Sequence, residues 1–290
     1  MANKSRFSIA ETSIKTFFKQ NNKRVFSREE LTKLFEDHKA GWNLPLYLNA
    51  TKFIDQLINK EILKSILIEF DSYRSNKQRF LVNDASVFHI AASLANRGYI
   101  SHYSAVFLNG LTNQVPKVIY VTFEQSKKAS IKSSLTQEAI DQAFSKPQRK
   151  SLASANYGDY SFLMLNGMFT NHSGIYMLEG IPVTNIERTL IDITVRPSYA
   201  GGVFSVLEAY QRALASKLVS INKLIATLDN MNFIYPYHQA VGFYLDKAGY
   251  QGKKLEEIKS KNSNFDFYLS YEIEEKQYSK HWKIYYPTGM

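Results

Sequence analysis

The segment SREELTKLFEDH at residues 27–38 begins the part of the sequence that decides the fold. Ser27 with Glu30 three positions later forms a capping box, so we predict that a helix begins just after Ser27. Apolar side chains then recur at the i, i+3 and i+4 spacing of a buried helix face: Leu31, Leu34 and Phe35. Gly41 and Pro45 interrupt this spacing, and we expect a turn there.

A second helix is predicted from about Asn49 to Lys60, and its two faces differ in chemistry. One face is apolar and carries Phe53, Ile54, Leu57 and Ile58. The other face carries the side chains that we expect to bind DNA, which are Thr51, Lys52, Gln56, Asn59 and Lys60. Hydroxyl, amide and ammonium groups of this kind hydrogen-bond to base edges and phosphates. The two helices are therefore interpreted as a helix-turn-helix.

A β-hairpin is predicted directly after the second helix. Residues 63–70 alternate between apolar and polar side chains, and residues 79–82 form the returning strand. Its tip and returning strand carry cationic side chains that we expect to contact DNA: Arg74, Lys77 and Arg79. An earlier helix, predicted over 8–20, completes a three-helix bundle. Residues 1–83 are therefore predicted to form a winged helix-turn-helix domain that places the 49–60 helix in the major groove of DNA.

The distribution of charge favours DNA as the partner of this domain. Residues 1–82 contain 15 Lys and Arg against nine Asp and Glu, so they hold over half of the formal net charge of +10. A basic domain with polar side chains along one helix is typical of nucleic-acid binding. Small modules of helices and a hairpin also dock other proteins, so a protein-interaction adaptor is an alternative interpretation.

The composition limits the classes of protein to which the chain can belong. With 44% hydrophobic residues among 290, folded cores are expected rather than disorder. The chain has no cysteine, which excludes disulfides, thiolate metal sites and a cysteine nucleophile. No apolar stretch is long enough for a secretion signal or a membrane span. We therefore expect a cytoplasmic protein without a membrane partner.

Residues 84–290 are predicted to form a larger domain of mixed helices and strands, so the fold class expected for the chain is mixed α/β (α+β). Helices are expected over 86–96, 101–109, 136–144, 184–195, 203–216, 220–229 and 236–248. Strands are expected over 117–123, 160–165, 174–178, 181–183, 265–269 and 282–286. Two short polar tracts, 125–134 and 253–264, contain no predicted helix or strand.

The helix predicted over 184–195 opens with a second capping box, Thr184 with Glu187. Arg188 and Asp192 lie four residues apart, which suits an ion pair along one helix face. Glu187, Arg188 and Asp192 could also serve catalysis. Because capping and ion pairing explain their positions, we interpret them as a structural or interaction motif.

Two runs of residues in the larger domain resemble the AbiEi family, the antitoxins of abortive-infection, type IV toxin–antitoxin systems. The first run is GYISHYSA at 98–105, followed by LNGLT at 108–112 and the strand end IYVT at 119–122. The second run is VTNIERTLID at 183–192, followed by Arg196-Pro197 and Gly201-Gly202. The order of the domains, a winged helix before a larger domain, also agrees with that family.

The resemblance implies a transcriptional repressor that binds inverted repeats upstream of its own operon, which suits a homodimer on DNA. It also implies an antitoxin that counteracts a co-transcribed, nucleotidyltransferase-like toxin in defence against phage. The partners expected from the resemblance are thus duplex operator DNA and the cognate toxin.

The sequence lacks the motifs of several enzyme classes: the phosphate-binding loop, the Gly-x-Ser-x-Gly elbow and the His-Glu-x-x-His zinc motif. It also has no Gly-Ser pair, which a nucleotidyltransferase needs before its Asp-x-Asp, so the chain is not the toxin of such a system. The enzymatic alternative is a metal-dependent nuclease that uses Asp266, Glu274 and Lys276. We expect no catalytic activity, no metal and no cofactor.

Overall fold

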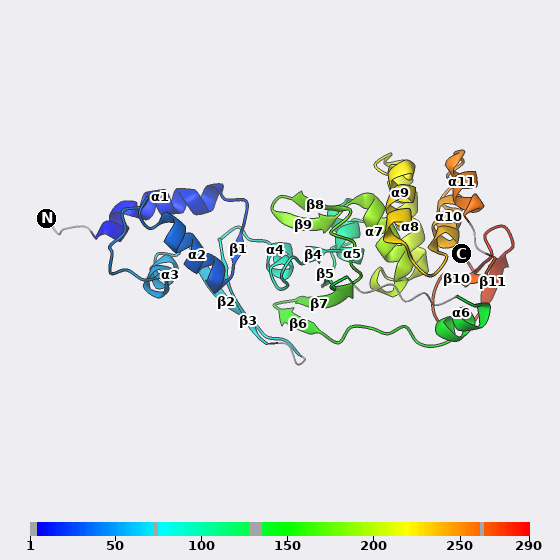
Figure 1. The fold of residues 1–290 in the computed structure, drawn as a ribbon, viewed down its shortest axis with the longest axis horizontal. Helices are drawn as coiled ribbons and strands as arrows, with labels where there is room; N and C mark the ends of the chain where they lie inside the picture. Colours follow the sequence, from blue (N-terminus) through cyan, green and yellow to red (C-terminus); the bar gives the residue numbers. More distant parts are fainter. Residues whose placement is uncertain (1–4, 72–74, 128–134, 262–263) are drawn as a thin grey trace.

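The computed structural model describes residues 5–71, 75–127, 135–261 and 264–290. It confirms the mixed α/β class, with helices and three mixed or antiparallel sheets. Three regions follow one another along the long axis: an N-terminal group of helices with a hairpin, a central sheet, and a C-terminal group of helices with a small sheet (Figure 1). No helix in the described ranges is long and apolar enough to cross a membrane.

The N-terminal region places three helices against a three-stranded sheet of order β1-β3-β2. Its elements are α1 (Arg6–Gln20), β1 (Val25–Phe26), α2 (Arg28–His38), α3 (Ala50–Asn59), β2 (Lys64–Ile68) and β3 (Lys77–Leu81). The capping box at the start of α2 is confirmed, since Ser27 Oγ accepts from Glu30 N and Glu30 Oε2 accepts from Ser27 N. Strand β1 was not predicted, because its two residues are too few to show any alternation.

Aromatic side chains fill the core between these helices and the sheet. Phe18, Phe35, Phe53 and Phe80 are all fully buried, and Phe35 and Phe53 lie with ring centroids 5.0 Å apart. The apolar face predicted for α3 is confirmed, because Phe53, Ile54 and Leu57 point into this core.

The opposite face of the first sheet packs against the central region. Val25, Ile68, Phe70 and Leu81 belong to one buried cluster with side chains of the central sheet, such as Ile119. Phe70 also forms a β-bridge with Ala155. The N-terminal and central regions therefore share one hydrophobic core.

The central region is built on a six-stranded sheet of order β6-β7-β5-β4-β9-β8. The pairs β5–β7 and β4–β9 are parallel, and the other neighbours are antiparallel. Its strands are β4 (Tyr99–Ile100), β5 (Val118–Glu124), β6 (Ser154–Tyr157), β7 (Tyr160–Gly167), β8 (Ile175–Leu178) and β9 (Ile181–Thr184). Its helices are α4 (Val87–Ala92), α5 (His102–Leu108) and α7 (Ile186–Val195).

The C-terminal region combines helices with a three-stranded sheet of order β10-β12-β11. Its elements are η1 (Pro197–Tyr199), α8 (Val203–Ala215), α9 (Ile221–Met231), α10 (Tyr237–Lys247), α11 (Lys254–Ser260), β10 (Phe267–Tyr268), β11 (Lys276–Ser279) and β12 (Ile284–Pro287). Helix α11 was missed in the polar tract 253–264, because Ile258 is its one fully buried side chain and leaves little apolar pattern.

Trp282 joins the small sheet to α10. Its side chain is 1% exposed, and its Nε1 donates to Asp246 Oδ2 at 2.8 Å. The ring lies directly on the backbone of Gly242, where a Cβ atom would stand 2.1 Å from Trp282 Cζ3. Any larger residue at position 242 would thus displace the indole ring.

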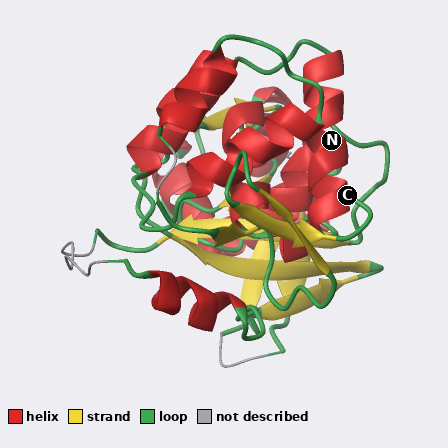
Figure 2. Ribbon diagram, turned by 90° about the vertical axis from the view of Figure 1, so that its right-hand side faces the viewer, coloured by secondary structure: helices red, strands yellow, loops and turns green. Residues whose placement is uncertain are grey.

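Helix α6 (Gln137–Phe144) belongs to the C-terminal region in space, although it lies between β5 and β6 in the chain (Figure 1). Phe144 stacks on Tyr271 with ring centroids 4.5 Å apart, and Gln137 Nε2 donates to the carbonyl oxygen of Asp266. Seen along the long axis, α6 stands apart from the other helices, across the strands (Figure 2). The chain must therefore return past the central region, along residues 145–153, to reach β6.

Candidate nucleic-acid interface and a cationic pocket

Helix α3 presents part of its predicted DNA-binding face to solvent. Thr51, Lys52 and Asn59 are exposed, and so is Asp55 on the same side. Asn49 caps the helix, because its Oδ1 accepts from Lys52 N at 2.9 Å. These residues can reach a nucleic acid without any rearrangement of the helix.

Two other residues predicted on this face point elsewhere. Gln56 is only partly exposed and lines a small cavity between the start of α1 and the loop 45–48. Lys60 Nζ lies 3.2 Å from Glu11 Oε2 on α1. The 3.6-residue period identified the polar side of α3 but could not show that α1 lies beside it. Gln56 is therefore only partly accessible, whereas Lys60 stays exposed while it pairs with Glu11.

Of the predicted hairpin cations that the structure describes, Lys77 and Arg79, the second is engaged within the protein. Arg74 lies outside the described residues, and Lys77 is partly exposed at the start of β3. Arg79 donates from Nη2 to Ser93 O at 2.8 Å and from Nε to Ser93 Oγ at 3.2 Å. Its guanidinium thus binds the C-terminal end of α4 and holds the hairpin to the central region. That contact was not foreseeable, because Ser93 is distant in the sequence.

Other basic residues, which the sequence did not single out, line a groove of about 1150 Å³ between the N-terminal and central regions. Those that belong to it are Lys23, Arg24, Arg28 and Arg97, together with Lys77 and Arg79. Glu29 and Glu30 lie in the same groove and reduce its positive charge. No sequence pattern joins these residues, because they come from separate segments of the chain.

The second capping box is wrong, because α7 begins one residue later than predicted. Asn185 is the N-cap, and its Oδ1 accepts from Arg188 N at 2.9 Å. Glu187 does not take part in capping α7. Its carboxylate instead accepts from the backbone N–H of Ser220, the N-cap residue of α9, at 2.9 Å. The carboxylate therefore caps a neighbouring helix, and Lys223 Nζ lies 3.4 Å from its second oxygen.

Replacing Glu187 with alanine is expected to lower the free energy of unfolding by about 1 kcal/mol, because the backbone N–H of Ser220 loses its acceptor. Glu187→Gln keeps an acceptor of the same shape and should lose less. Urea denaturation of the two variants measures the difference. Equal midpoints for the wild type and Glu187→Ala would show that the contact contributes nothing.

The predicted ion pair between Arg188 and Asp192 is confirmed and lies in the interior. Arg188 is 2% exposed, and its Nε donates to Asp192 Oδ1 at 2.8 Å. Its Nη1 donates to Thr170 Oγ1 at 3.0 Å and to Ser173 O at 2.9 Å. Burial is the largest single influence and lowers the pKa of Arg188, but the charges of Asp192, Tyr99 and Glu124 and the hydrogen bond to Asp192 together outweigh it, so the pKa is raised. The pair fixes α7 to the loop after β7.

His102 lies beside this pair at the start of α5. Its backbone adopts a left-handed conformation with φ of 51°, which is strained for a residue with a side chain. Its Nδ1 lies 2.8 Å from Ser101 Oγ, which in turn lies 2.7 Å from Thr122 Oγ1. Burial lowers the pKa of His102 to about 4, so the ring is neutral near pH 7.

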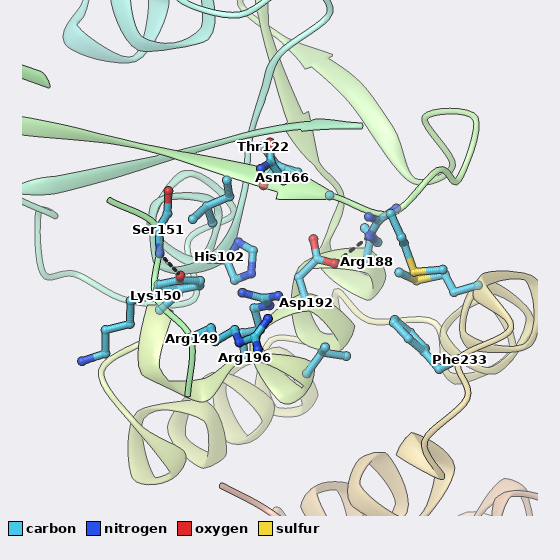
Figure 3. A pocket seen from close by; sticks show the side chains of 16 residues that line it. His102, Thr122, Arg149, Lys150, Ser151, Asn166, Arg188, Asp192, Arg196 and Phe233 are labelled. Atoms are coloured by element: carbon cyan, nitrogen blue, oxygen red, sulfur yellow. Dashed lines mark hydrogen bonds and ion pairs between the residues drawn. The ribbon is translucent and has the colours of Figure 1, made fainter. Parts of the chain in front are cut away.

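These groups face a pocket of about 330 Å³ in the larger part of the chain. Its cationic side chains are Arg149, Lys150, Arg188 and Arg196, and its one carboxylate is Asp192. Its apolar side chains are Leu165, Met168, Val195, Met231 and Phe233, with Tyr199 also in the lining. Figure 3 shows Arg149, Lys150 and Arg196 on one side, Phe233 on the other, and Asp192 with Arg188 between them. Apart from Arg188 and Asp192, no residue of this pocket was singled out from the sequence.

Two of the three residues proposed for a nuclease, Asp266 and Lys276, are engaged in other contacts, while Glu274 is exposed just before β11. Asp266 Oδ1 accepts from Tyr278 OH at 2.6 Å. Lys276 Nζ lies over the rings of Tyr268 and Tyr285, and β12 separates β10 from β11. Among the residues that the structure describes, no group of three His, Cys, Asp or Glu side chains could hold a metal ion. The geometry therefore gives no support to the nuclease alternative.

The comparison with known proteins adds no assignment: no protein-family model matches the chain, and neither does any curated protein.

Proposed function

We propose that this protein is a DNA-binding transcriptional regulator whose N-terminal region is a winged helix-turn-helix. The observation that supports this most is the element order helix, strand, helix, helix, strand, strand with a sheet of order β1-β3-β2. In that arrangement α3 would enter the major groove, and the β2–β3 hairpin would lie against the DNA backbone. Thr51, Lys52 and Asn59 are the exposed side chains of α3 that would make the contacts.

Binding of duplex DNA by the full-length chain should weaken steeply with salt. Neutralising about five phosphates gives a slope of log affinity against log salt near −4 to −5. Lys52→Ala should reduce this slope by about 1, while Asn59→Ala should cost about 1–3 kcal/mol and relax sequence preference. Lys253→Ala, which removes an exposed cation in the C-terminal region, is the matched control and should change neither.

Fluorescence anisotropy at several salt concentrations measures these effects. A flat salt response of the wild-type protein would contradict the proposal. The same holds if Lys253→Ala weakened binding as much as Lys52→Ala.

We further propose that the larger part of the chain acts as an antitoxin of the AbiEi type, without catalysis. The two runs that resemble that family lie against each other in the structure. Asn109 Nδ2 donates to Thr184 O at 2.9 Å and to Thr189 Oγ1 at 3.2 Å, so α5 is tied to the start of α7. Arg188 Nη2 reaches Tyr99 OH at 3.4 Å. These contacts support the interpretation of the two runs as one structural framework rather than two separate sites.

Repression and toxin neutralisation should be separable in the full-length protein. Lys52→Ala/Asn59→Ala is expected to lose repression of the operon promoter but still protect cells that express the neighbouring nucleotidyltransferase-like gene. A reporter fusion and a growth assay measure the two activities. A downstream gene of another class would contradict the antitoxin proposal. The wild type could instead cleave DNA with Mg²⁺, and Asp266→Ala/Glu274→Ala/Lys276→Ala could be the one variant that loses both this cleavage and protection. That result would also contradict the proposal and would restore the nuclease alternative.

A further inference from the structure

The pocket beside α7 has more cationic than anionic side chains in its lining. Arg149, Lys150 and Arg196 are exposed at its edge, and within the described part of the chain none of the three forms an ion pair. The remaining cation, Arg188, is already neutralised by Asp192. Positive charges gathered at the mouth of one cavity raise the local potential and attract an anion.

The segment that supplies two of these cations is held firmly on both sides. Gln148 Oε1 accepts from Ser198 Oγ at 2.5 Å, just before Arg149. Ser151 N donates to Tyr199 OH at 3.0 Å and Ser151 Oγ donates to Met164 O at 2.6 Å, just after Lys150. Because η1 and β7 fix this return segment, the backbone that carries Arg149 and Lys150 is positioned before any ligand arrives. Such preorganisation favours binding.

The far side of the pocket is suited to an apolar group. Met231 is buried, and Phe233, which packs against Tyr237 with ring centroids 5.0 Å apart, lines the cavity. The volume of about 330 Å³ lies at the lower end of the range for small-molecule sites. In Figure 3 Arg149 and Arg196 stand on one side of the space and Phe233 on the other, while the side chain of Lys150 extends away from it.

We propose that this pocket binds a small phosphate monoester whose compact apolar or aromatic body lies against Met231 and Phe233. A phosphate dianion matches Arg149 and Arg196 better than a single carboxylate does, since guanidinium groups bind phosphate oxygens in pairs. The site is independent of the DNA-binding face, because none of its residues belongs to the N-terminal region.

Calorimetric titration of the full-length protein with phenyl phosphate tests the proposal. Inorganic phosphate, which has no aromatic group, is the comparison ligand. Phenyl phosphate should bind at least about tenfold more tightly than inorganic phosphate, since burial of a ring is worth about 1.5–3 kcal/mol. Arg149→Ala/Arg196→Ala should weaken phenyl phosphate about 30-fold or more. Arg212→Ala, an exposed arginine on α8 outside the pocket, is the matched control and should bind as the wild type does.

The apolar side is tested by Phe233→Leu and Phe233→Ala, with Phe204→Ala on the surface of α8 as control. These two variants at position 233 should lose affinity for phenyl phosphate progressively and leave that for inorganic phosphate unchanged. Thermal unfolding confirms that each variant is folded. Three results would overturn the proposal: no saturation by about 10 mM phenyl phosphate, equal binding by Arg149→Ala/Arg196→Ala and the wild type, or displacement of phenyl phosphate by duplex DNA, which would assign these cations to nucleic acid instead.

Discussion

Arg188→Ala is expected to lower the free energy of unfolding by about 3–5 kcal/mol, because it leaves the buried Asp192 carboxylate without its partner. It also removes the donors that Thr170 Oγ1 and Ser173 O accept from, so the loop after β7 loses its attachment to α7. Guanidinium chloride denaturation measures the loss. A reduction below about 1 kcal/mol would mean that water replaces the guanidinium at little cost.

A double variant distinguishes the net contribution of the ion pair to stability from the destabilisation caused by leaving one of its charges buried without a partner. Arg188→Met/Asp192→Leu removes both charges and keeps most of the volume, so it should recover a large share of the stability that Arg188→Ala loses. Asp192→Leu alone should be about as damaging as Arg188→Ala, because it strands the guanidinium. Additive losses in the double variant would show that the two residues do not act as a pair.

Trp282→Ala is expected to destabilise the protein by about 3–5 kcal/mol as well, because it opens a cavity beneath α10 and leaves Asp246 without the indole donor. Trp282→Phe keeps part of the packing and should lose less. His281→Ala, at the neighbouring exposed position in the turn between β11 and β12, is the control and should be nearly neutral.

Near-ultraviolet circular dichroism and thermal unfolding of Trp282→Ala and its controls measure this effect. If Trp282→Ala were as stable as the wild type, the contact between the indole ring and Gly242 would not hold the C-terminal sheet to α10.

The sequence predicted those parts of the fold that depend on near neighbours in the chain. The capping box of Ser27 and Glu30 and the pair of Arg188 with Asp192 both lie within one helical turn or its entry, and both are confirmed. Helix α3 has enough apolar residues at the right spacing for its buried face to be identified. Local hydrogen bonding and periodicity suffice in such cases.

The features that could not be predicted are contacts between elements that are distant in the sequence. Gln56 was assigned to the solvent face of α3, and the ion pair of the exposed Lys60 with Glu11 was missed, because nothing in the local pattern shows that α1 lies beside that edge. Glu187 fits a cap for its own helix by spacing, yet its carboxylate reaches Ser220. The cationic pocket draws its residues from several separate segments, among them the return segment after α6. Such contacts are set by tertiary packing, which no short window records.

The shared core between the first sheet and the central region restricts how this protein can be cut or recombined. A break after residue 83 would bring Val25, Ile68, Phe70 and Leu81 to the surface, and Gly180 would lose its close contact with the backbone of Asn22. An isolated N-terminal fragment would thus carry an adhesive apolar patch. A chimera that joins the N-terminal region to another protein would need counterparts of β6 and the β8–β9 turn on that protein. Substitutions on one side of this shared core therefore require compensating substitutions on the other side.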